Sequence, residues 1–469
     1  MIKKILFAIA ICVLLVFSVS AENALDISGD VDITAEGIGK AAFLDRNLRT
    51  FSSGEAVAVS IKSETPIGGI WLRYSDTPKG GSLNGKVICE HGMWSEYIPI
   101  DGETEVILSF DRVALCELYV YSKGELPSEV QVFEFSQSET DLMLFASHSD
   151  DDQLFFAGLL PLYVAKGDVD VKVCFFTTSY QEISRVHELL SGLWHCGVKN
   201  YPIILPFPDE YSESFDGAKR LLEASGYPYD DIKQVIRDVL DTYKPQVVVL
   251  HDFRGEYGHG THIFATATIV DVIESASDGD FTPHKVYVHL YKENEIALPI
   301  DEPLDALGGK SPFNISQEAF QNHKSQHWTW FYGWIYGKNG SITKASQITT
   351  YSPIYYGLYL SDVGADIGND MLENIETRYE RALRIGGETF ESIFQEIYGM
   401  DFSAKDEADE KPVTTAVSEA VKDNTAEESV NFGHLLPIIA AVIAATVAII
   451  TVTKKARKYG RYPDKRTLK

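Results

Sequence analysis

Two short stretches of this sequence contain residue types that bind metal ions. The first, SHSDDD at residues 147–152, places one histidine and three aspartates within five consecutive positions. The second, GHGTH at residues 258–262, places His259 and His262 three positions apart, with Gly260 allowing a tight turn between them. Imidazole and carboxylate groups are ligands that a borderline-soft dication such as Zn²⁺ accepts. Together the two stretches predict a metal site.

The elements expected around these stretches bring them to the same edge of one sheet. DLMLFAS (141–147) predicts a buried strand followed by a helix to about residue 166, and PQVVVL (245–250) predicts a strand followed by another helix. Apolar strands alternate with amphipathic helices up to about residue 291, which predicts an α/β domain with a Rossmann-like parallel sheet covered on both faces. Sites in such sheets lie outside the carboxyl ends of the strands.

The residues alone define most of a catalytic metal site. His148, Asp151 and one of His259 or His262 are the expected ligands, which leaves a coordination position open for water. One aspartate and one histidine then remain as a general base and as an oxyanion-stabilising group. Each stretch also has a structural interpretation, because an acidic residue such as Asp152 can cap a helix and a lone HxxH is often structural.

The two stretches resemble the signatures of a known family. SHSDDD looks like A-H-P-D-D-E, and GHGTH looks like G-H-x-D-H, of the PIG-L/LmbE-like family of zinc-dependent N-deacetylases. RVHELLSGLWHCGV (185–198) and HKSQ (323–326) are similar to two further motifs of that family. The resemblance implies removal of acetyl groups from N-acetylglucosamine-type sugars in conjugates.

The resemblance also implies a role for individual residues. The implied zinc ligands are His148, Asp151 and His262. Asp150 would act as general base, His259 would polarise the carbonyl, and Tyr257 would close over it. Arg185 would face the sugar. Three positions depart from the family pattern: Ser149 replaces proline, Asp152 replaces glutamate and Thr261 replaces aspartate. The last replacement removes a carboxylate that would orient a catalytic histidine.

Several segments outside the expected metal domain have distinct compositions. Short alternating strands separated by turn residues, among them 105–110, 116–122 and 129–135, predict a β-sandwich at 25–138 that is loosely similar to discoidin-type jelly rolls. A deacetylase domain with a C-terminal extension is expected to follow it at 139–400. The remaining segments are expected to be a signal peptide (1–21), a disordered acidic linker (401–431), a transmembrane helix (432–453) and a basic cytoplasmic tail (454–469). This order predicts a single-pass cell-membrane protein with its N-terminal bulk extracytoplasmic.

The charge of the chain argues against one class of partner. The formal net charge is −27, although the tail at 454–469 is itself basic. So acidic a chain is a poor candidate for binding nucleic acid through general electrostatics.

Some features admit more than one function. The aromatic stretch HWTWFYGWIYG (327–337) is either a platform for sugars or packing for the C-terminal extension, and Arg254 and Glu256 either contact substrate hydroxyls or pair with each other. We expect a zinc deacetylase acting on an N-acetylated sugar. The alternatives are a surface glycan-binding protein with an inactive metallohydrolase domain, and a hydrolase of a different amide.

Overall fold

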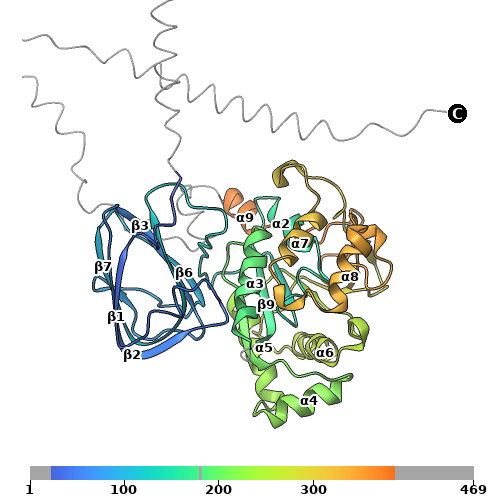
Figure 1. Cartoon of the computed structure of the whole chain (residues 1–469). Coiled ribbons are helices and arrows are strands. Elements are labelled where there is room, and N and C mark those ends of the chain that lie inside the picture. Colours follow the sequence, from blue (N-terminus) through green and yellow to red (C-terminus); the bar gives the residue numbers. More distant parts are fainter. Residues whose placement is uncertain (1–22, 179–181, 386–469) are drawn as a thin grey trace, which may run out of the picture. The chain divides into compact units, whose positions relative to one another are not determined.

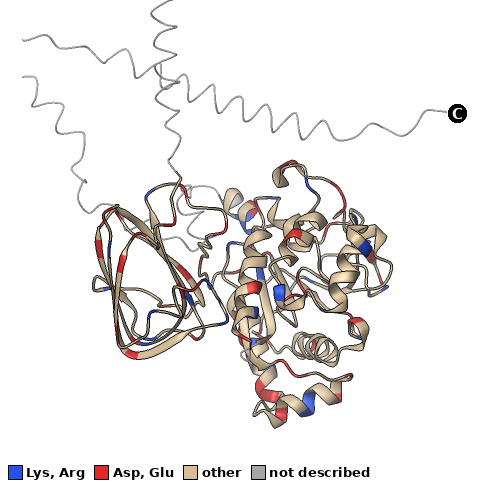
Figure 2. Ribbon diagram, viewed as in Figure 1, with Lys and Arg blue, Asp and Glu red and all other residues tan. Residues whose placement is uncertain are grey.

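The computed structural model describes residues 23–178 and 182–385 (Figure 1). The expected signal peptide, acidic linker, transmembrane helix and basic tail lie outside the described residues. Figure 2 shows acidic residues on both the β domain and the α/β domain, with Lys and Arg scattered among them in this view.

Among the described residues, every helix is too short or too polar to span a membrane.

The N-terminal part of the chain is an antiparallel β domain. Its seven strands are β1 (Asp32–Glu36), β2 (Ser52–Lys62), β3 (Ile67–Tyr74), β4 (Ser82–Leu83), β5 (Lys86–Val87), β6 (Ser95–Pro99) and β7 (Glu105–Ser122). The first half of β7 pairs with β2 and its second half with β3, so one sheet curls on itself (Figure 1). The main apolar core of the domain contains residues from these strands.

This arrangement does not confirm the expected two-sheet sandwich. All seven strands hydrogen-bond in one sheet, because the separate strands expected at 105–110 and 116–122 form one continuous strand. Residues 129–135 also do not form the strand that their alternation predicted. Only an isolated bridge joins Glu134 to Asn200, at the entry to the second domain.

The second domain is built on a seven-stranded sheet. In spatial order its strands are β10 (Ile203–Pro208), β9 (Val171–Thr178), β8 (Leu142–Ala146), β11 (Val247–Leu250), β12 (Lys285–His289), β14 (Tyr355–Ser361) and β13 (Glu295–Ala297). The first five are parallel, as predicted, and the last two add antiparallel pairs that were not predicted from the sequence.

Helices cover both faces of this sheet. Leu142 and Leu144 of β8 point into a core with α2 (Leu159–Val164), α3 (Ile183–His195) and α7 (Pro312–Phe320). Met143 and Phe145 point the other way, into a core with α4 (Phe215–Ala224), α5 (Tyr229–Tyr243) and α6 (Gly260–Glu274). The continuous apolar strands are explained by this burial on two faces. Two further helices are α8 (Trp330–Tyr336) and α9 (Arg378–Ile385).

The helix expected directly after the aspartates begins later than predicted. Residues 150–158 form successive turns, and α2 starts only at Leu159. Gly158 has a φ of 87°, and a Cβ there would lie 2.8 Å from the Ile300 side chain, so a side chain at this position would be both strained and crowded. The acidic triplet therefore lies in a buried turn rather than in the first turn of a helix.

The strand order creates a crevice beside β8. The chain moves outward from β8 to β9 and β10, then returns to place β11 and β12 on the other side. Ligands bind at such a switch point, outside the carboxyl ends of the strands. The first histidine–aspartate stretch follows β8 and the second follows β11, so both metal-binding stretches lie at this crevice.

His187 on α3 joins the two domains. Its Nε2 donates a hydrogen bond to the Tyr74 carbonyl of β3 at 2.9 Å, while Nδ1 is buried with no hydrogen-bond partner among the described residues. Burial and the nearby Arg73 charge hold the pKa of His187 well below its usual range. The imidazole therefore stays neutral in the folded protein.

This neutral histidine predicts a loss of stability in mild acid. Below about pH 6.5 the unfolded chain protonates His187 and the folded chain does not, so the free energy of unfolding falls by about 1.4 kcal/mol per pH unit from this group. Chemical denaturation between pH 7.5 and 5.5 should show a shallower pH dependence for His187→Gln than for the parent. His195→Gln, at the exposed end of the same helix, should retain the parent slope; equal slopes for all three proteins would contradict the assignment.

Candidate metal centre

Three buried side chains bring one ligand atom each to a common point. His148 Nδ1 lies 3.2 Å from Asp151 Oδ2 and 3.0 Å from His262 Nε2, and the last two atoms are 3.4 Å apart. Tetrahedral ligands about 2.0–2.1 Å from a zinc ion would be about 3.3 Å from one another. The three distances and the two-nitrogen, one-oxygen donor set therefore fit a dication such as Zn²⁺.

His259 belongs to the same cluster but faces a different partner. Its ring lies 4.6 Å from the His148 ring and 4.9 Å from the His262 ring, so its nitrogens are also near enough for an alternative ligand set. However, His259 caps α6, with Nδ1 accepting a hydrogen bond from the Thr261 backbone N–H at 3.2 Å. That bond leaves the proton of the neutral ring on Nε2, which makes Nε2 a donor rather than a metal ligand.

Burial keeps the cluster histidines of α6 neutral. It lowers the pKa of His259 to about 2 and the pKa of His262 to about 4. Neutral imidazole is the form that either ligates a metal or donates one hydrogen bond to a neutral or anionic oxygen.

Glu256 organises the histidines around the cluster. Its side chain is fully buried and accepts hydrogen bonds from Nδ1 of His251 at 2.8 Å, of His262 at 2.6 Å and of His289 at 2.6 Å. These interactions outweigh burial and hold the pKa of Glu256 well below its usual range. Because His262 donates through Nδ1, its Nε2 keeps a lone pair directed at His148 and Asp151.

His251 lies beside Asp151 yet is committed to the scaffold. Its Nε2 is 3.3 Å from Asp151 Oδ2, which makes Asp151, His251 and His262 another geometrically possible ligand group. That same Nε2 accepts a hydrogen bond from the Ser147 backbone N–H at 3.0 Å, and Nδ1 donates to Glu256. Both nitrogens of His251 are therefore engaged, so it fixes the turn after β8 instead of offering a free lone pair.

Asp150 has the position and charge environment of a base. Its Oδ1 lies 3.5 Å from an Arg185 nitrogen, and its Oδ2 is buried with no hydrogen-bond partner among the described residues. Burial raises the pKa of Asp150 to about 6, opposed by the Arg185 charge. A carboxylate with a free oxygen and a raised pKa can accept a proton near neutral pH.

Arg185 joins Asp150 to a residue of the neighbouring strand end. Its second terminal nitrogen lies 3.1 Å from Asp209 Oδ2, directly after β10, and Asp209 Oδ1 lies 3.4 Å from His148 Nε2. The loop that carries Asp209 is held to the start of α6 by the Gly260 N–H, which donates to the Ser212 carbonyl at 2.7 Å. A Cβ at Gly260 would lie 2.8 Å from the Ser212 backbone, so this close approach requires glycine.

Tyr257 covers the cluster from the turn between β11 and α6. Its ring lies 5.4 Å from the His259 ring and 5.8 Å from the His262 ring. Its backbone has a φ of 51°, an uncommon conformation for a residue with a side chain. Burial raises the pKa of the phenol, so the hydroxyl remains a hydrogen-bond donor.

Residues 143–273 match the sequence model of the family PIG-L, described as GlcNAc-PI de-N-acetylase. This segment is a PIG-L domain. The matched range begins in β8 and ends in α6, so it contains every predicted site residue.

The chain is also similar to two enzymes named as deacetylases. A 1D-myo-inositol 2-acetamido-2-deoxy-alpha-D-glucopyranoside deacetylase of Mycobacteroides abscessus is 27% identical over 157 residues, covering 29% of this chain and 56% of that enzyme. The enzyme with the same name from Geodermatophilus obscurus is 26% identical over 202 residues, covering 37% of this chain and 68% of that enzyme. The chain thus spans about half the length of the first of these relatives.

Solved structures give weaker matches. A conserved protein of Thermus thermophilus aligns with 15% identity and a TM-score of 0.29, covering 49% of this chain and 97% of that protein. A deacetylase from the biosynthesis of teicoplanin aligns with 14% identity and the same TM-score, covering 40% of this chain and 85% of that enzyme. TM-scores this low do not establish a shared fold.

The PIG-L domain brings together all seven residues singled out in the sequence: His148, Asp150, Asp151, Arg185, Tyr257, His259 and His262. Arg185 contacts Asp150 and Asp209, so part of its donor capacity is already used within the protein. Neither interpretation offered for Glu256 was right. Glu256 binds histidines, whereas Arg254 pairs with Asp252 at 3.0 Å.

Three residues of the PIG-L site were not predicted from the sequence, and a fourth, Glu256, was expected in a different role. Asp209, His251 and His289 each stand at or directly after the carboxyl end of a parallel strand, so the rule that located the other ligands also points to them. Glu256 lies inside a short turn and gave no comparable signal. Its carboxylate supplies His262 with the kind of acidic partner that the replacement by Thr261 seemed to remove.

Replacing Glu256 should weaken metal binding without removing a ligand. The Glu256→Gln amide keeps one acceptor oxygen but turns N–H donors toward histidine N–H groups. The proton of His262 is then no longer held on Nδ1. We expect zinc affinity to fall about 10- to 100-fold, the range seen for partners of metal-ligating histidines. Competition with a chromogenic chelator measures it. Glu223→Gln, an exposed residue of α4, should retain the parent affinity, and an unchanged affinity in Glu256→Gln would contradict the assigned role.

Proposed function

We propose that this protein is a zinc-dependent N-deacetylase that hydrolyses the acetamide of an N-acetylglucosamine-type sugar in a glycan or glycoconjugate. The observation that carries the proposal is the meeting of three ligand atoms at 3.0–3.4 Å from one another, with the free oxygen of Asp150 and the neutral donor His259 in the same cluster. The match of residues 143–273 to the PIG-L family and the two curated deacetylases support the same reaction.

Zn²⁺ suits the ligand set of His148, Asp151 and His262. When bound, it would supply Lewis acidity toward the acetamide carbonyl and lower the pKa of water. Asp209 and Asp151 raise the pKa of His148 against the effect of burial, so metal uptake there competes with a proton. Metal affinity is therefore expected to decrease in mild acid.

The remaining site residues account for the proton movements. Asp150 removes a proton from the attacking water through its unpartnered Oδ2 and returns it to the leaving nitrogen, which gives acetate and a free amino sugar. His259 Nε2–H and the Tyr257 hydroxyl donate hydrogen bonds to the oxyanion that develops on the carbonyl. Arg185 pairs with both Asp150 and Asp209, which holds Asp150 in position, and it faces the sugar.

The proposed location is the cell membrane, with the PIG-L domain outside the cytoplasm. The support is in the sequence: residues 432–453 contain no Asp, Glu, Lys or Arg, and the basic segment 454–469 follows them. The expected signal peptide at 1–21 supports export of the domains between them. The partner in this proposal is an N-acetylated glycan or glycoconjugate.

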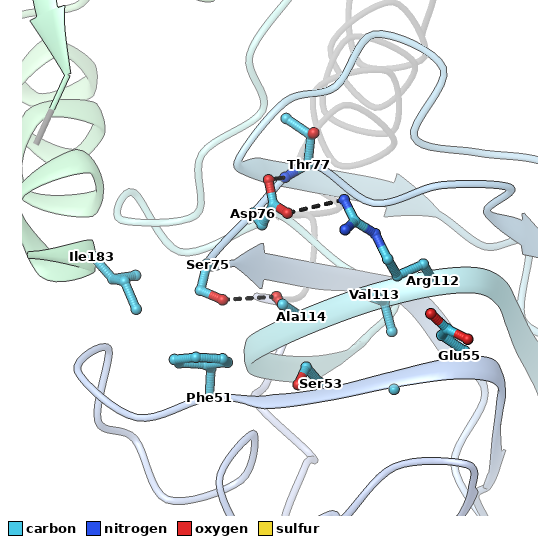
Figure 3. A pocket seen from close by; sticks show the side chains of 11 residues that line it. Phe51, Ser53, Glu55, Ser75, Asp76, Thr77, Arg112, Val113, Ala114 and Ile183 are labelled. Atoms are coloured by element: carbon cyan, nitrogen blue, oxygen red, sulfur yellow. Dashed lines mark hydrogen bonds and ion pairs between the residues drawn. The ribbon is translucent and has the colours of Figure 1, made fainter. Parts of the chain in front are cut away.

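A glycan-binding role remains the second candidate, because the β domain offers a place for it. A groove of about 490 Å³ is lined by Phe51, which is half exposed, and by the ion pair between Arg112 and Asp76 at 3.1 Å (Figure 3). Sites for small molecules combine aromatic surface with a few polar groups that fix the ligand's orientation, and this groove has both. The intact metal cluster favours catalysis as the main function.

Asp150→Asn tests the proposed reaction directly. The amide cannot accept a proton, so kcat for acetate release from N-acetylglucosamine-containing glycans should fall about 10²- to 10⁴-fold while the bound zinc remains. His262→Ala should instead lose the zinc, and Asp216→Asn, exposed on α4, should match the parent. Undiminished acetate release by Asp150→Asn would remove Asp150 from the mechanism. Bound zinc with no acetate from any glycan would favour another amide or the glycan-binding role.

A further inference from the structure

The aromatic stretch at 327–337 divides into a packed part and an open part. Ile335 is fully buried, and the rings of Phe331 and Trp334 lie 5.9 Å and 5.4 Å from the ring of Phe155, behind the metal cluster. These residues confirm the packing interpretation. Trp330, at the start of α8, is 48% exposed, although it belongs to the same helix.

Trp330 is connected to the catalytic cluster through Tyr257. The two rings meet edge to face, with centroids 5.5 Å apart, and Tyr257 lies 5.4 Å from His259. The ring of Phe331 packs against the Trp330 indole, with ring centroids 4.4 Å apart. The indole is therefore fixed by two neighbours while about half of its surface stays open beside the site.

A second open ring borders the same histidine. Tyr211 is 63% exposed, and its ring meets the His259 ring edge to face at 5.1 Å. Its loop is held in place by the hydrogen bond between Gly260 and Ser212. Exposed aromatic surface next to a cluster of convergent polar groups is characteristic of a ligand-binding wall. The apolar C–H faces of a pyranose are the part of an N-acetylated glycan that such rings contact.

The position of Trp330 relative to His259 indicates which part of the ligand it contacts. Tyr257 lies between the indole and His259, so Trp330 lies one ring beyond the group that faces the acetamide. Building on the proposed function, we propose that Trp330 binds the sugar unit adjacent to the one that is deacetylated. The preferred substrate is then an oligosaccharide or glycan chain rather than a single N-acetylated sugar.

Chain-length dependence of the reaction tests this proposal. Acetate release is measured for the full chain with N-acetylglucosamine and with its β-linked di- and tetrasaccharides. The parent should show a higher kcat/KM for the oligomers than for the monomer. Trp330→Ala should lower the ratio of kcat/KM for the oligomers to kcat/KM for the monomer about five- to tenfold, the scale of one lost aromatic contact. Trp330→Phe, which keeps a ring, should fall between the two.

Trp328 provides the matched control, because it is 84% exposed in the same segment. Trp328→Ala should keep the parent preference for oligomers, and the melting temperatures of all variants show whether the segment remains folded. A parent enzyme without any preference for oligomers would overturn the proposal, as would a Trp330→Ala variant that retains it. Either result leaves the deacetylase function standing. Absence of acetate from every sugar, with zinc bound, would instead count against the proposed function itself.

Discussion

The carboxylate of Glu256 fixes which nitrogen of the surrounding histidines carries a proton. It accepts hydrogen bonds from His251, His262 and His289 in a fully buried position, and each bond places a proton on Nδ1. His262 can then present Nε2 to His148 and Asp151, and His251 can accept the Ser147 N–H that shapes the turn after β8. Without this carboxylate, the tautomers of His262 in the ligand triangle and of His251 beside that turn would not be defined.

The strand order supplies the other half of the constraint. Residues from β8, β10, β11 and β12 reach one point because parallel strands end at the same edge and the chain reverses direction beside β8. The site therefore combines residues that lie more than a hundred positions apart in the sequence, and it needs little loop structure to do so. The β domain contacts the helix α3 of the second domain, where His187 donates a hydrogen bond to the Tyr74 carbonyl. His187 is two residues from Arg185, so the inter-domain contact and the site share one helix.

The predictability of each part follows from the range of the interactions that form it. The parallel sheet and the ligand residues were predictable, because apolar strands and the polar residues at their ends are local features of the sequence. The curled β sheet was not, since nothing local shows that 105–110 and 116–122 form one strand or that 129–135 leaves the sheet. The role of Glu256 was not predictable, because its partners come from the residue after β11, from α6 and from β12, and they converge only in three dimensions.

The most direct test of the metal centre is anomalous diffraction at the zinc absorption edge, from crystals of the protein grown with zinc. The structure predicts one strong peak within bonding distance of His148 Nδ1, Asp151 Oδ2 and His262 Nε2, with Glu256 still hydrogen-bonded to His262 Nδ1. A peak on His251 or His259 in place of His148 or His262, or no peak at this cluster, would contradict it.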